Sequence, residues 1–431
     1  MNSINDKGIV VSLNKKVLNN TLSICRQALS FIIKAAEEHY GEWESLKSLE
    51  KSRFVEKLVH TTKSNTALYD FDTQFKKFPS YLRRSAISKA VGVVESYHSN
   101  LENWKKSGKK GKEPRLSYDH FWNPAFYRSK GGDVKITGQF TVSIRVFENN
   151  DWDWITVLLK GNDVQYLEKH CQNRKILSPS LKKVHGSYYL CWAFEENKTL
   201  VEGESTSYKV CAVDMGIITD ATCCIMDSEG TVYARKFIKS VYEKDQLNHL
   251  LNRIKGNQQR SQSVKNLWVY AKNFNTEISR KTANAIIDFA VENDASCIVF
   301  EHLNTIGKKH GRRKQRLQHW KHREIQKMVE LKAHRYGLHI SHICAWGTSK
   351  LAFDGSGETK RGNQISEGTP YDICQFSNGK VYNCDLNASY NIGARYFLRE
   401  FERLEMGYNL PSSPKRTLSD LKKLNSVMWL L

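Results

Sequence analysis

Three acidic residues, each in a different local setting, are the side chains of this chain best suited to chemistry. Asp214 follows the apolar run 210–213, Glu301 follows the apolar run 297–300, and Asp385 lies at the start of a helix-like stretch. Three carboxylates that converge on one point repel each other unless a cation lies between them. Mg²⁺ is typically held by a few carboxylates together with substrate phosphate oxygens. The pattern therefore predicts that Asp214, Glu301 and Asp385 are catalytic metal ligands of a two-metal site that cleaves phosphodiester bonds.

Each acid also has a simpler, structural interpretation. An aspartate after a buried strand is often a turn residue, as we expect for Asp220 and Asp227. A glutamate after a strand is often only solvated, and Asp385 could be an N-cap of the helix that follows it. For any one acid alone we would favour the structural interpretation. The three together, in this order and these settings, favour the catalytic one.

The composition indicates a large basic protein with a polyanionic partner. Its 431 residues are enough for more than one domain. The chain has 66 Lys and Arg against 45 Asp and Glu, a formal net charge of +21, which favours nucleic acid as the partner. No apolar run approaches the roughly 20 residues of a membrane span, and the first residues lack the apolar region of a signal peptide. The ten cysteines lie mostly in apolar runs, as in reduced cytoplasmic proteins.

The positive charge is concentrated in two clusters that are candidate nucleic-acid contacts. The first consists of Lys105, Lys106, Lys109 and Lys110, in a Gly-containing segment. The second follows Glu301 and consists of Lys308, Lys309, Arg312, Arg313, Lys314 and Arg316. The first cluster could equally be a solvated loop or a grip on a phosphate backbone. The second is the stronger candidate, because a polyanionic substrate needs positive charge close to a carboxylate site.

The elements that must position these residues change in character along the chain. Apolar residues recur at helical spacing over 17–40 and 80–104, which predicts a helical bundle. From about 127 to 209 the spacing changes to period two, which predicts a small antiparallel barrel or sandwich. Strands and helices alternate after residue 210, so we expect an α/β sheet with the acids at its edge.

Within this last region the expected elements are more specific. Strands are predicted near 210–213, 222–226 and 231–237, followed by a long basic helical stretch over about 239–273 and a second helix over 278–293. Another helix reaches Tyr336, with Gly337 as its C-terminal stop, and a strand follows over 340–346. Residues 347–383 form a long polar insertion rich in Gly and Ser, of the kind that is functional or flexible.

The order of the acidic segments resembles that of a known family. Val-Asp-Met-Gly-Ile (213–217), Val-Phe-Glu-His-Leu (299–303) and the stretch 384–395, Cys-Asp-Leu-Asn-Ala-Ser-Tyr-Asn-Ile-Gly-Ala-Arg, look like the split RuvC nuclease core of the TnpB family. These are transposon-encoded, RNA-guided DNA endonucleases related to type V CRISPR effectors. Residues 320–337 and Gly-Thr-Ser-Lys (347–350) are similar too. The likeness covers most of 205–400, whereas the N-terminal half matches only in order and size.

The resemblance implies a multidomain α+β protein with an RNase H-like α/β core split in sequence. It implies an N-terminal helical bundle inserted in or next to a small, wedge-like antiparallel β-barrel. The implied boundaries are the start of the wedge-like domain at 1–16, a helical recognition domain at 17–126, the wedge-like barrel at 127–206, the RuvC-like core at 207–346, a zinc-finger-like insertion at 347–383, the last core segment at 384–400 and a tail at 401–431.

The resemblance also implies the chemistry and the partners. Asp214, Glu301 and Asp385 would bind Mg²⁺, two ions in all, and metal-activated water would attack the phosphodiester of DNA. A bound guide RNA would select a double-stranded or single-stranded DNA target by pairing, next to a short flanking motif read by the protein. Such a protein would work at the nucleoid of a prokaryotic cytoplasm. Asn387 and Asn391, one helical turn apart, could orient the site, or could equally cap and pack the helix.

The insertion departs from the family pattern. Typical members carry a four-cysteine zinc module between the second and third acids, and structural zinc needs paired ligands at short spacing. Here only Cys374 and Cys384 remain in the insertion, with Cys344 before it, and residues 348–355 stand where the first cysteine pair would be. We expect no zinc, with the insertion keeping its role in handling nucleic acid without the metal.

Two other functions compete with a guided endonuclease. The first is a nuclease-inactive, RNA-guided DNA-binding repressor derived from the same family, whose signature would be loss of one or more acids. All three acids are present, which argues against it. The second is an unguided RuvC-type nuclease, for which the large N-terminal half is more than the enzyme should need.

Overall fold

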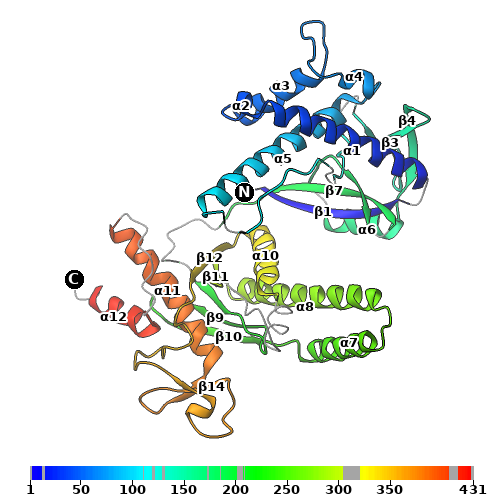
Figure 1. Cartoon of the computed structure of the whole chain (residues 1–431). Coiled ribbons are helices and arrows are strands. Elements are labelled where there is room, and N and C mark those ends of the chain that lie inside the picture. The colour runs from blue at the N-terminus through cyan, green and yellow to red at the C-terminus, as the bar shows by residue number, and fades with distance from the viewer. Residues whose placement is uncertain are drawn as a thin grey trace. The chain divides into compact units, whose positions relative to one another are not determined.

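The structure is a computed structural model. It describes residues 2–11, 15–109, 111–118, 122–128, 132–171, 174–184, 186–200, 207, 209–303, 321–406 and 416–428. These fall into two compact units, residues 2–196 and the residues from 197 onward, and each unit is described by itself (Figure 1).

Helices dominate the first part of the N-terminal unit. They are α1 (Lys15–Glu38), α2 (Tyr40–Trp43), α3 (Ser48–Val59), α4 (Phe71–Gln74) and α5 (Ser80–Lys106). The long helices α1 and α5 pack against each other, and α3 packs against both. The apolar positions of α1 are buried at helical spacing, including Leu18, Leu22, Leu29 and Ile33. The helices predicted over 17–40 and 80–104 are therefore confirmed, because burial of one apolar stripe fixes both their extent and their packing.

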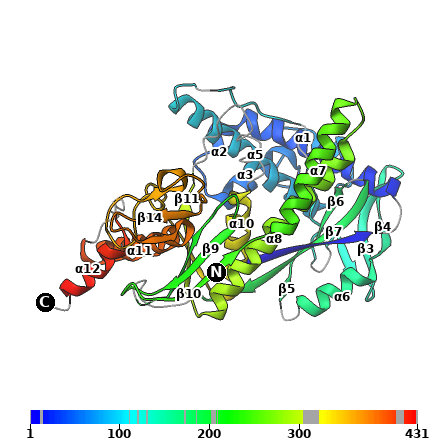
Figure 2. The ribbon, with the colours of Figure 1, turned by 90° about the horizontal axis from the view of Figure 1, so that it is seen from below.

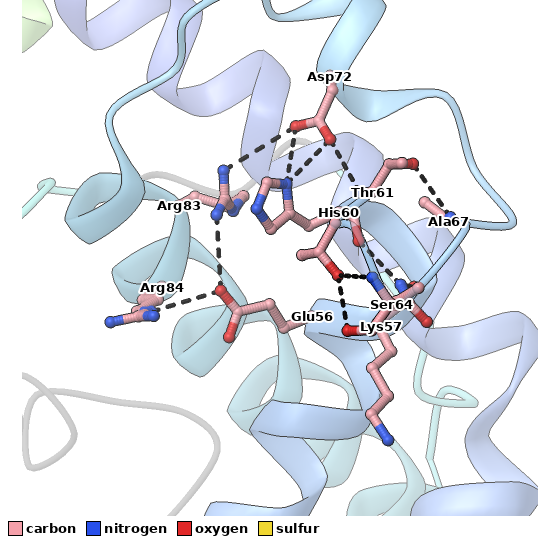
Figure 3. A network of polar contacts seen from close by, with 11 residues as sticks. Glu56, Lys57, His60, Thr61, Ser64, Ala67, Asp72, Arg83 and Arg84 are labelled. Atoms are coloured by element: carbon pink, nitrogen blue, oxygen red, sulfur yellow. Dashed lines mark hydrogen bonds and ion pairs between the residues drawn. The ribbon is translucent and has the colours of Figure 1, made fainter.

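A polar network ties three of these helices together (Figure 3). Arg83 on α5 is only 6% exposed, and its guanidinium lies 3.6 Å from Glu56 on α3 and 3.9 Å from Asp72 on α4. His60 meets the same Asp72 carboxylate at 2.9 Å from Nδ1 to Oδ2. Burial lowers the pKa of Arg83, and the two carboxylates oppose that effect. The pairing is what allows a charged side chain to lie inside the bundle.

The strands of this unit form two separate sheets among the described residues, so the prediction of a single barrel is wrong. One sheet contains β1 (Asn2–Val11), β7 (Ser187–Asn197), β5 (Lys175–Ile176) and β6 (Ser180–Val184), and the other contains β2 (Val134–Ile136), β3 (Thr141–Glu148) and β4 (Asp151–Leu158). Helix α6 (Gly161–His170) follows β4. The reason is that α1 packs on β3, where Val142, Ile144 and Val146 are buried. A sheet face covered by a helix needs no further strands to close over it.

A five-stranded sheet forms the centre of the C-terminal unit. Its order is β10 (Val232–Ile238), β9 (Ala221–Met226), β8 (Val210–Asp214), β11 (Cys297–His302) and β12 (His339–Cys344). The first three strands are antiparallel, and β11 runs parallel to both β8 and β12. The predicted strands near 210–213, 222–226, 231–237 and 340–346 are confirmed. Every residue of β8 and β9 is buried, as expected for strands covered on both faces.

Helices cover the two faces of this sheet (Figure 2). On one face, Cys211, Val213, Ile298 and Phe300 pack in one core with residues of α8 (Lys265–Glu292) and α10 (His322–Ala333). On the other face, the alternate residues 210, 212, 297 and 299 pack with α11 (Cys384–Met406) and α12 (Leu418–Met428). A short 3₁₀ turn after α10 ends at Gly337 with a φ of 75°, the predicted left-handed stop.

The long helical region before β11 is divided at a different place from the one predicted. Helix α7 (Val241–Gln259) ends before the turn 260–264, and α8 then runs without a break to Glu292. The expected division between 273 and 278 is wrong, because Ala271, Asn275 and Ile278 are buried on one continuous helical face. Ser261 lies in the turn with a φ of 55°.

The insertion between β12 and α11 is folded. It contains the small sheet of β13 (Lys360–Arg361), β14 (Ile373–Gln375) and β15 (Val381–Asn383), with a 3₁₀ turn over Gly362–Gln364. Its core is apolar and consists of Ala352, Cys374, Phe376 and Cys384, with Phe353 and Tyr382 packed against them. A tightly hydrogen-bonded module thus leads directly into the first residue of α11.

Candidate active site

Asp214 and Glu301 are brought together by the pairing of two parallel strands. Val213 of β8 is opposite Phe300 of β11, so Asp214 and Glu301 occupy the next position on each strand. Side chains alternate between the faces of a strand, and residues 212 and 299 face α11. Both carboxylates therefore project toward the α11 face. They are 8% and 6% exposed, which places them inside the protein and rules out the solvated interpretation of Glu301.

Asp385 approaches from helix α11, which packs on β8, β9 and β11. It is the second residue of that helix, and Asn383 supplies the N-cap: the backbone N–H groups of Asp385 and Leu386 both donate to Asn383 Oδ1 at 3.0 Å. The simple capping interpretation of Asp385 is thus wrong, since the cap is already provided. Its carboxylate is free to face the other acids and accepts a hydrogen bond from the Thr219 side chain.

The electrostatics of the three carboxylates show that they share one environment. Burial raises the pKa of Asp214 well above its usual range, and the charges of Glu301 and Asp385 raise it further. Burial also raises the pKa of Glu301 and the pKa of Asp385. Like charges that raise a pKa are close enough to repel, so the other two acids both oppose ionisation of Asp214.

Three cationic side chains offset part of this repulsion. Arg361 of the insertion lowers the pKa of both Asp214 and Asp385, and Lys239 lowers that of Asp385. Arg395 of α11 lowers the pKa of Glu301. Arg361 is fixed by a hydrogen bond from Nη2 to the carbonyl of Ser349, while its Nε is buried without a hydrogen-bond partner among the described residues. The insertion therefore delivers a positive charge to the acids.

Helix α11 holds the chain segment that supports Glu301. Asn391 donates from Nδ2 to the carbonyls of Thr348 and Leu351 at 2.9 and 2.8 Å, and Asn387 donates to Leu351 at 2.9 Å. Arg395, one turn further, donates from Nη1 to the carbonyls of Cys344 and Trp346 at 3.0 and 2.7 Å. The side chains of Asn387 and Asn391 thus hold the backbone of the neighbouring segment 348–351 in place.

The turn after Asp214 is held in a similar way. Lys244 of α7 donates from Nζ to the carbonyls of Ile217 and Ile218 at 2.8 and 2.9 Å, and pairs with Asp220 at 2.8 Å. Gly216 is required within this turn, because a Cβ there would lie 2.7 Å from the carbonyl oxygen of Thr219. The turn places Thr219 against Asp385. Asp220, expected as a turn residue, is a buried anchor for Lys244.

A divalent cation is the group that the acids of this site would hold. The donor set suits one chemically, because the buried Asp214 and Glu301 and the half-buried Asp385, all with raised pKa values, offer hard oxygen ligands and excess negative charge. As placed, however, the described His, Cys, Asp and Glu side chains contain no group of three arranged to hold a metal ion. The three carboxylates are therefore close enough for two of them to raise the pKa of Asp214, but as placed they do not surround a single ion position.

The predicted basic clusters are only partly described. Lys105, Lys106 and Lys109 are exposed near the C-terminal end of α5, where Lys106 pairs with Glu102 at 2.6 Å and Lys109 lies over the Trp104 ring at 5.9 Å. Lys110 lies outside the described residues. So do all members of the second cluster: Lys308, Lys309, Arg312, Arg313, Lys314 and Arg316.

Several residues near the acids were missed by the sequence analysis. Arg361, Thr219 and Thr348 each touch or influence an acidic residue, yet they are common residue types in turns and in a polar insertion. The Gly-Thr-Ser-Lys segment was noticed only for its resemblance. The one sequence feature that could have indicated Thr219 is its position shortly after Asp214.

Comparisons with known proteins bear on the two units differently. A family model described as the Aq_aa04 family matches residues 7–148. The uncharacterized protein aq_aa04 of Aquifex aeolicus (strain VF5) is 33% identical over 120 residues, which is 27% of this chain and 66% of that relative, just under two thirds of its length. The family model ends before the first of the three acids, and the relative aligns with only 27% of this chain. Neither match therefore assigns chemistry to the acids.

Solved structures resemble the chain over most of its length. Cas12f1 in a complex with sgRNA and target DNA is similar with a TM-score of 0.56 and 13% identity, over 88% of this chain and 81% of that one. CasPhi-2 (Cas12j) bound to crRNA and phosphorothioate-DNA is similar with a TM-score of 0.48 and 10% identity, over 95% and 92%. The first likeness shows a shared multidomain α+β fold. Separately, none of the described helices has the length and apolar character needed to cross a membrane.

Proposed function

We propose that this protein is an RNA-guided DNA endonuclease whose active site consists of Asp214, Glu301 and Asp385. The observation that carries the proposal is the arrangement of these acids: two occupy equivalent positions on paired parallel strands, and the third begins the helix packed over them. Their raised pKa values fit a site that is completed by cations. The resemblance of the surrounding segments to the RuvC core of the TnpB family supports the same chemistry.

In this proposal the three carboxylates hold Mg²⁺, two ions in all. Bound Mg²⁺ would supply water activation, substrate orientation and charge neutralisation for hydrolysis of a phosphodiester. Thr348 and Thr219 hold Glu301 and Asp385 in place through their hydroxyl groups. Arg361 lies where its positive charge can act on a phosphate of the substrate, because that charge already acts on two of the acids.

The similarity in fold supports a guide RNA and a target DNA as the partners of this protein. Cas12f1, which has a similar fold, was determined with sgRNA and target DNA. A net charge of +21 suits a chain that holds two polyanions. Pairing between guide and target would select the DNA, while the N-terminal unit would read a short flanking motif. The domain boundaries expected from the family, and the phosphate-binding role of the two basic clusters, belong to this proposal.

The decisive experiment uses the full chain purified from cells that carry its native locus. RNA that co-purifies is sequenced, and DNA matching its guide portion is offered with Mg²⁺. The proposal expects a discrete RNA and cleavage of matching DNA that is lost in Asp214→Ala, with guided binding retained. A discrete RNA with binding and no cleavage would instead establish the repressor. Cleavage without RNA would establish an unguided nuclease.

A further inference from the structure

The helical hairpin of α7 and α8 contains a stretch with an unusual composition. From residue 246 to residue 276 the sequence has no Asp or Glu, whereas it has five basic residues and is rich in Asn and Gln. The five are Arg253, Lys255, Arg260, Lys265 and Lys272, and all are exposed. Exposed helical faces usually mix both signs of charge, so a stretch without carboxylates marks a surface for an anion.

The rest of the hairpin provides an internal comparison. Near the sheet, the cations have partners: Lys244 pairs with Asp220, Arg280 with Glu277, and Lys281 with Glu243 at 2.8 Å. None of the five basic residues of the 246–276 stretch pairs with a carboxylate in the part of the chain that the structure describes. No described carboxylate of the protein therefore compensates the positive charge there.

This part of the hairpin is held together by its own core. Leu247, Ile254, Ala271 and Ile278 are buried together, with Val264, Leu267 and Phe274 among the residues packed against them. This cluster is separate from the two cores that flank the sheet. Both views show α7 and α8 side by side and extending beyond the strands of their unit (Figures 1 and 2). Side chains on the outer surfaces of the hairpin are exposed, including those of the five basic residues.

Aromatic side chains lie among the cations. Lys265, Trp268 and Lys272 share one face of α8 because they are three and four residues apart. Trp268 is 40% exposed, and Tyr270, on another side of the helix, is 59% exposed. An indole between two lysines suits the flat face of an unpaired base whose phosphates lie on either side. Duplex DNA offers no such base face.

We infer that the outer surface of the α7–α8 hairpin, residues 246–276, binds an unpaired segment of RNA. The inference rests on the proposed function, in which the acids receive DNA and the protein must hold an RNA as well. The exposed amides favour RNA over DNA, because Asn and Gln side chains can both donate to and accept from a ribose 2′-hydroxyl. The five cations contact phosphates, and Trp268 stacks on a base.

The test uses the full-length protein with an unstructured RNA oligonucleotide that contains 4-thiouridine, and DNA of the same sequence that contains 4-thiothymidine. We expect ultraviolet light to crosslink the RNA to peptides of the 246–276 stretch, and unlabelled RNA to compete better than DNA. Trp268→Ala should remove the crosslink at that face. Crosslinks confined to other segments, or equal competition by DNA, would overturn the inference.

A matched pair of double variants tests the role of charge. Lys265→Gln with Lys272→Gln should lower the slope of log Kd against log salt by about 1.4, since each single-strand phosphate contact contributes about 0.7. Arg280→Gln with Lys281→Gln removes two cations of the same helix that already have carboxylate partners, Glu277 and Glu243, and should leave the slope nearly unchanged. An equal fall of the slope in both double variants would mean that RNA binding depends only on net charge, and this would contradict a specific binding surface at residues 246–276. Guided cleavage lost in Asp214→Ala is a separate readout, so either proposal can fail alone.

Discussion

Thr348 donates its hydroxyl hydrogen to the carboxylate of Glu301 across a separation of 47 residues. The same threonine is held from the other side, because Asn391 of α11 donates to its backbone carbonyl at 2.9 Å. Helix α11 also carries Asp385 at its start. One helix therefore fixes two of the three acids, Asp385 directly and Glu301 through Thr348. Such support keeps buried carboxylates in place when a substrate or an ion arrives.

Loss of this hydrogen bond should change both the rate and the pH dependence of cleavage. Burial raises the pKa of Glu301, and the Thr348 hydroxyl opposes that rise. In Thr348→Val the pKa should rise further, so the ionised carboxylate needed to hold a metal forms only at higher pH. We expect cleavage to fall about ten- to hundredfold at neutral pH, the equivalent of one hydrogen bond to a charged group. The acid limb of the pH–rate profile should move to higher pH.

Thr348→Ser provides the control for that experiment, since it keeps the hydroxyl and loses only a methyl group. It should retain the wild-type pH profile, and both variants should bind guided DNA normally. A Val variant whose acid limb does not move would show that the hydroxyl serves packing only.

Repulsion among the acids predicts that neutralising one of them stabilises the protein when metal is absent. The pKa of Asp214 is raised in the folded state, so the protonated Asp214 carboxyl contributes to the stability of the fold. This contribution is complete below the unfolded pKa and is lost as the pH rises through the folded pKa. At neutral pH, which is above the unfolded pKa, the raised pKa of Asp214 is a cost to stability, and Asp214→Asn removes that cost. With EDTA present, the Tm of the variant should exceed that of the wild type, by about 2 to 4 °C for each kcal/mol of relief.

Addition of Mg²⁺ should reverse this order. The wild type should gain stability as the cation binds, and Asp214→Asn should gain little, because it lacks one ligand. The same thermal melts at low pH, where the wild-type carboxylates are protonated, should bring the two proteins close together. A variant that melts lower than the wild type in EDTA at neutral pH would contradict the repulsion.

The buried Arg83 should be essential to the stability of the helical part of the N-terminal unit. Arg83→Met removes the buried guanidinium that both the Glu56 and the Asp72 carboxylates face, and loss of a polar contact to a charged group costs about 1.5–3 kcal/mol. Its neighbour Arg84 is a natural control: it reaches the same Glu56 at 3.4 Å, but its side chain is 61% exposed. Arg84→Met should cost less than about 1 kcal/mol in urea unfolding. Equal losses in the two variants would show that burial does not decide the effect.

The insertion should fold without zinc. Ala352 is buried together with Cys374 and Cys384. Asn378 donates from Nδ2 to Asp354 Oδ2 at 2.9 Å. Apolar packing and hydrogen bonds thus hold this module together. Elemental analysis of the purified protein should find well under one zinc per chain, and a strong chelator should not lower its Tm. Stoichiometric zinc that is lost together with Tm on chelation would overturn this expectation.

Local patterns of the sequence determined the main elements of this protein. The apolar spacing of α1 and α5 predicted both helices, because burial of one stripe is a local property of 3.6-residue periodicity. The runs before Asp214 and Glu301 predicted buried strands for the same kind of reason. The order of the three acids, together with the local setting of each, predicted the candidate site. The apolar spacing is continuous across residues 273–278, so it marks no break there, and the break predicted between the two helices at that place was wrong.

Only the tertiary structure decided how these pieces meet. The register of β8 against β11 places Asp214 beside Glu301, and a shift of one residue would have turned one of them to the opposite face. The cap from Asn383 leaves the Asp385 carboxylate free, and the folded insertion carries Arg361 to the acids. The two separate N-terminal sheets arise because α1 covers β3. These outcomes depend on contacts between residues far apart in sequence, and neither periodicity nor composition records such contacts.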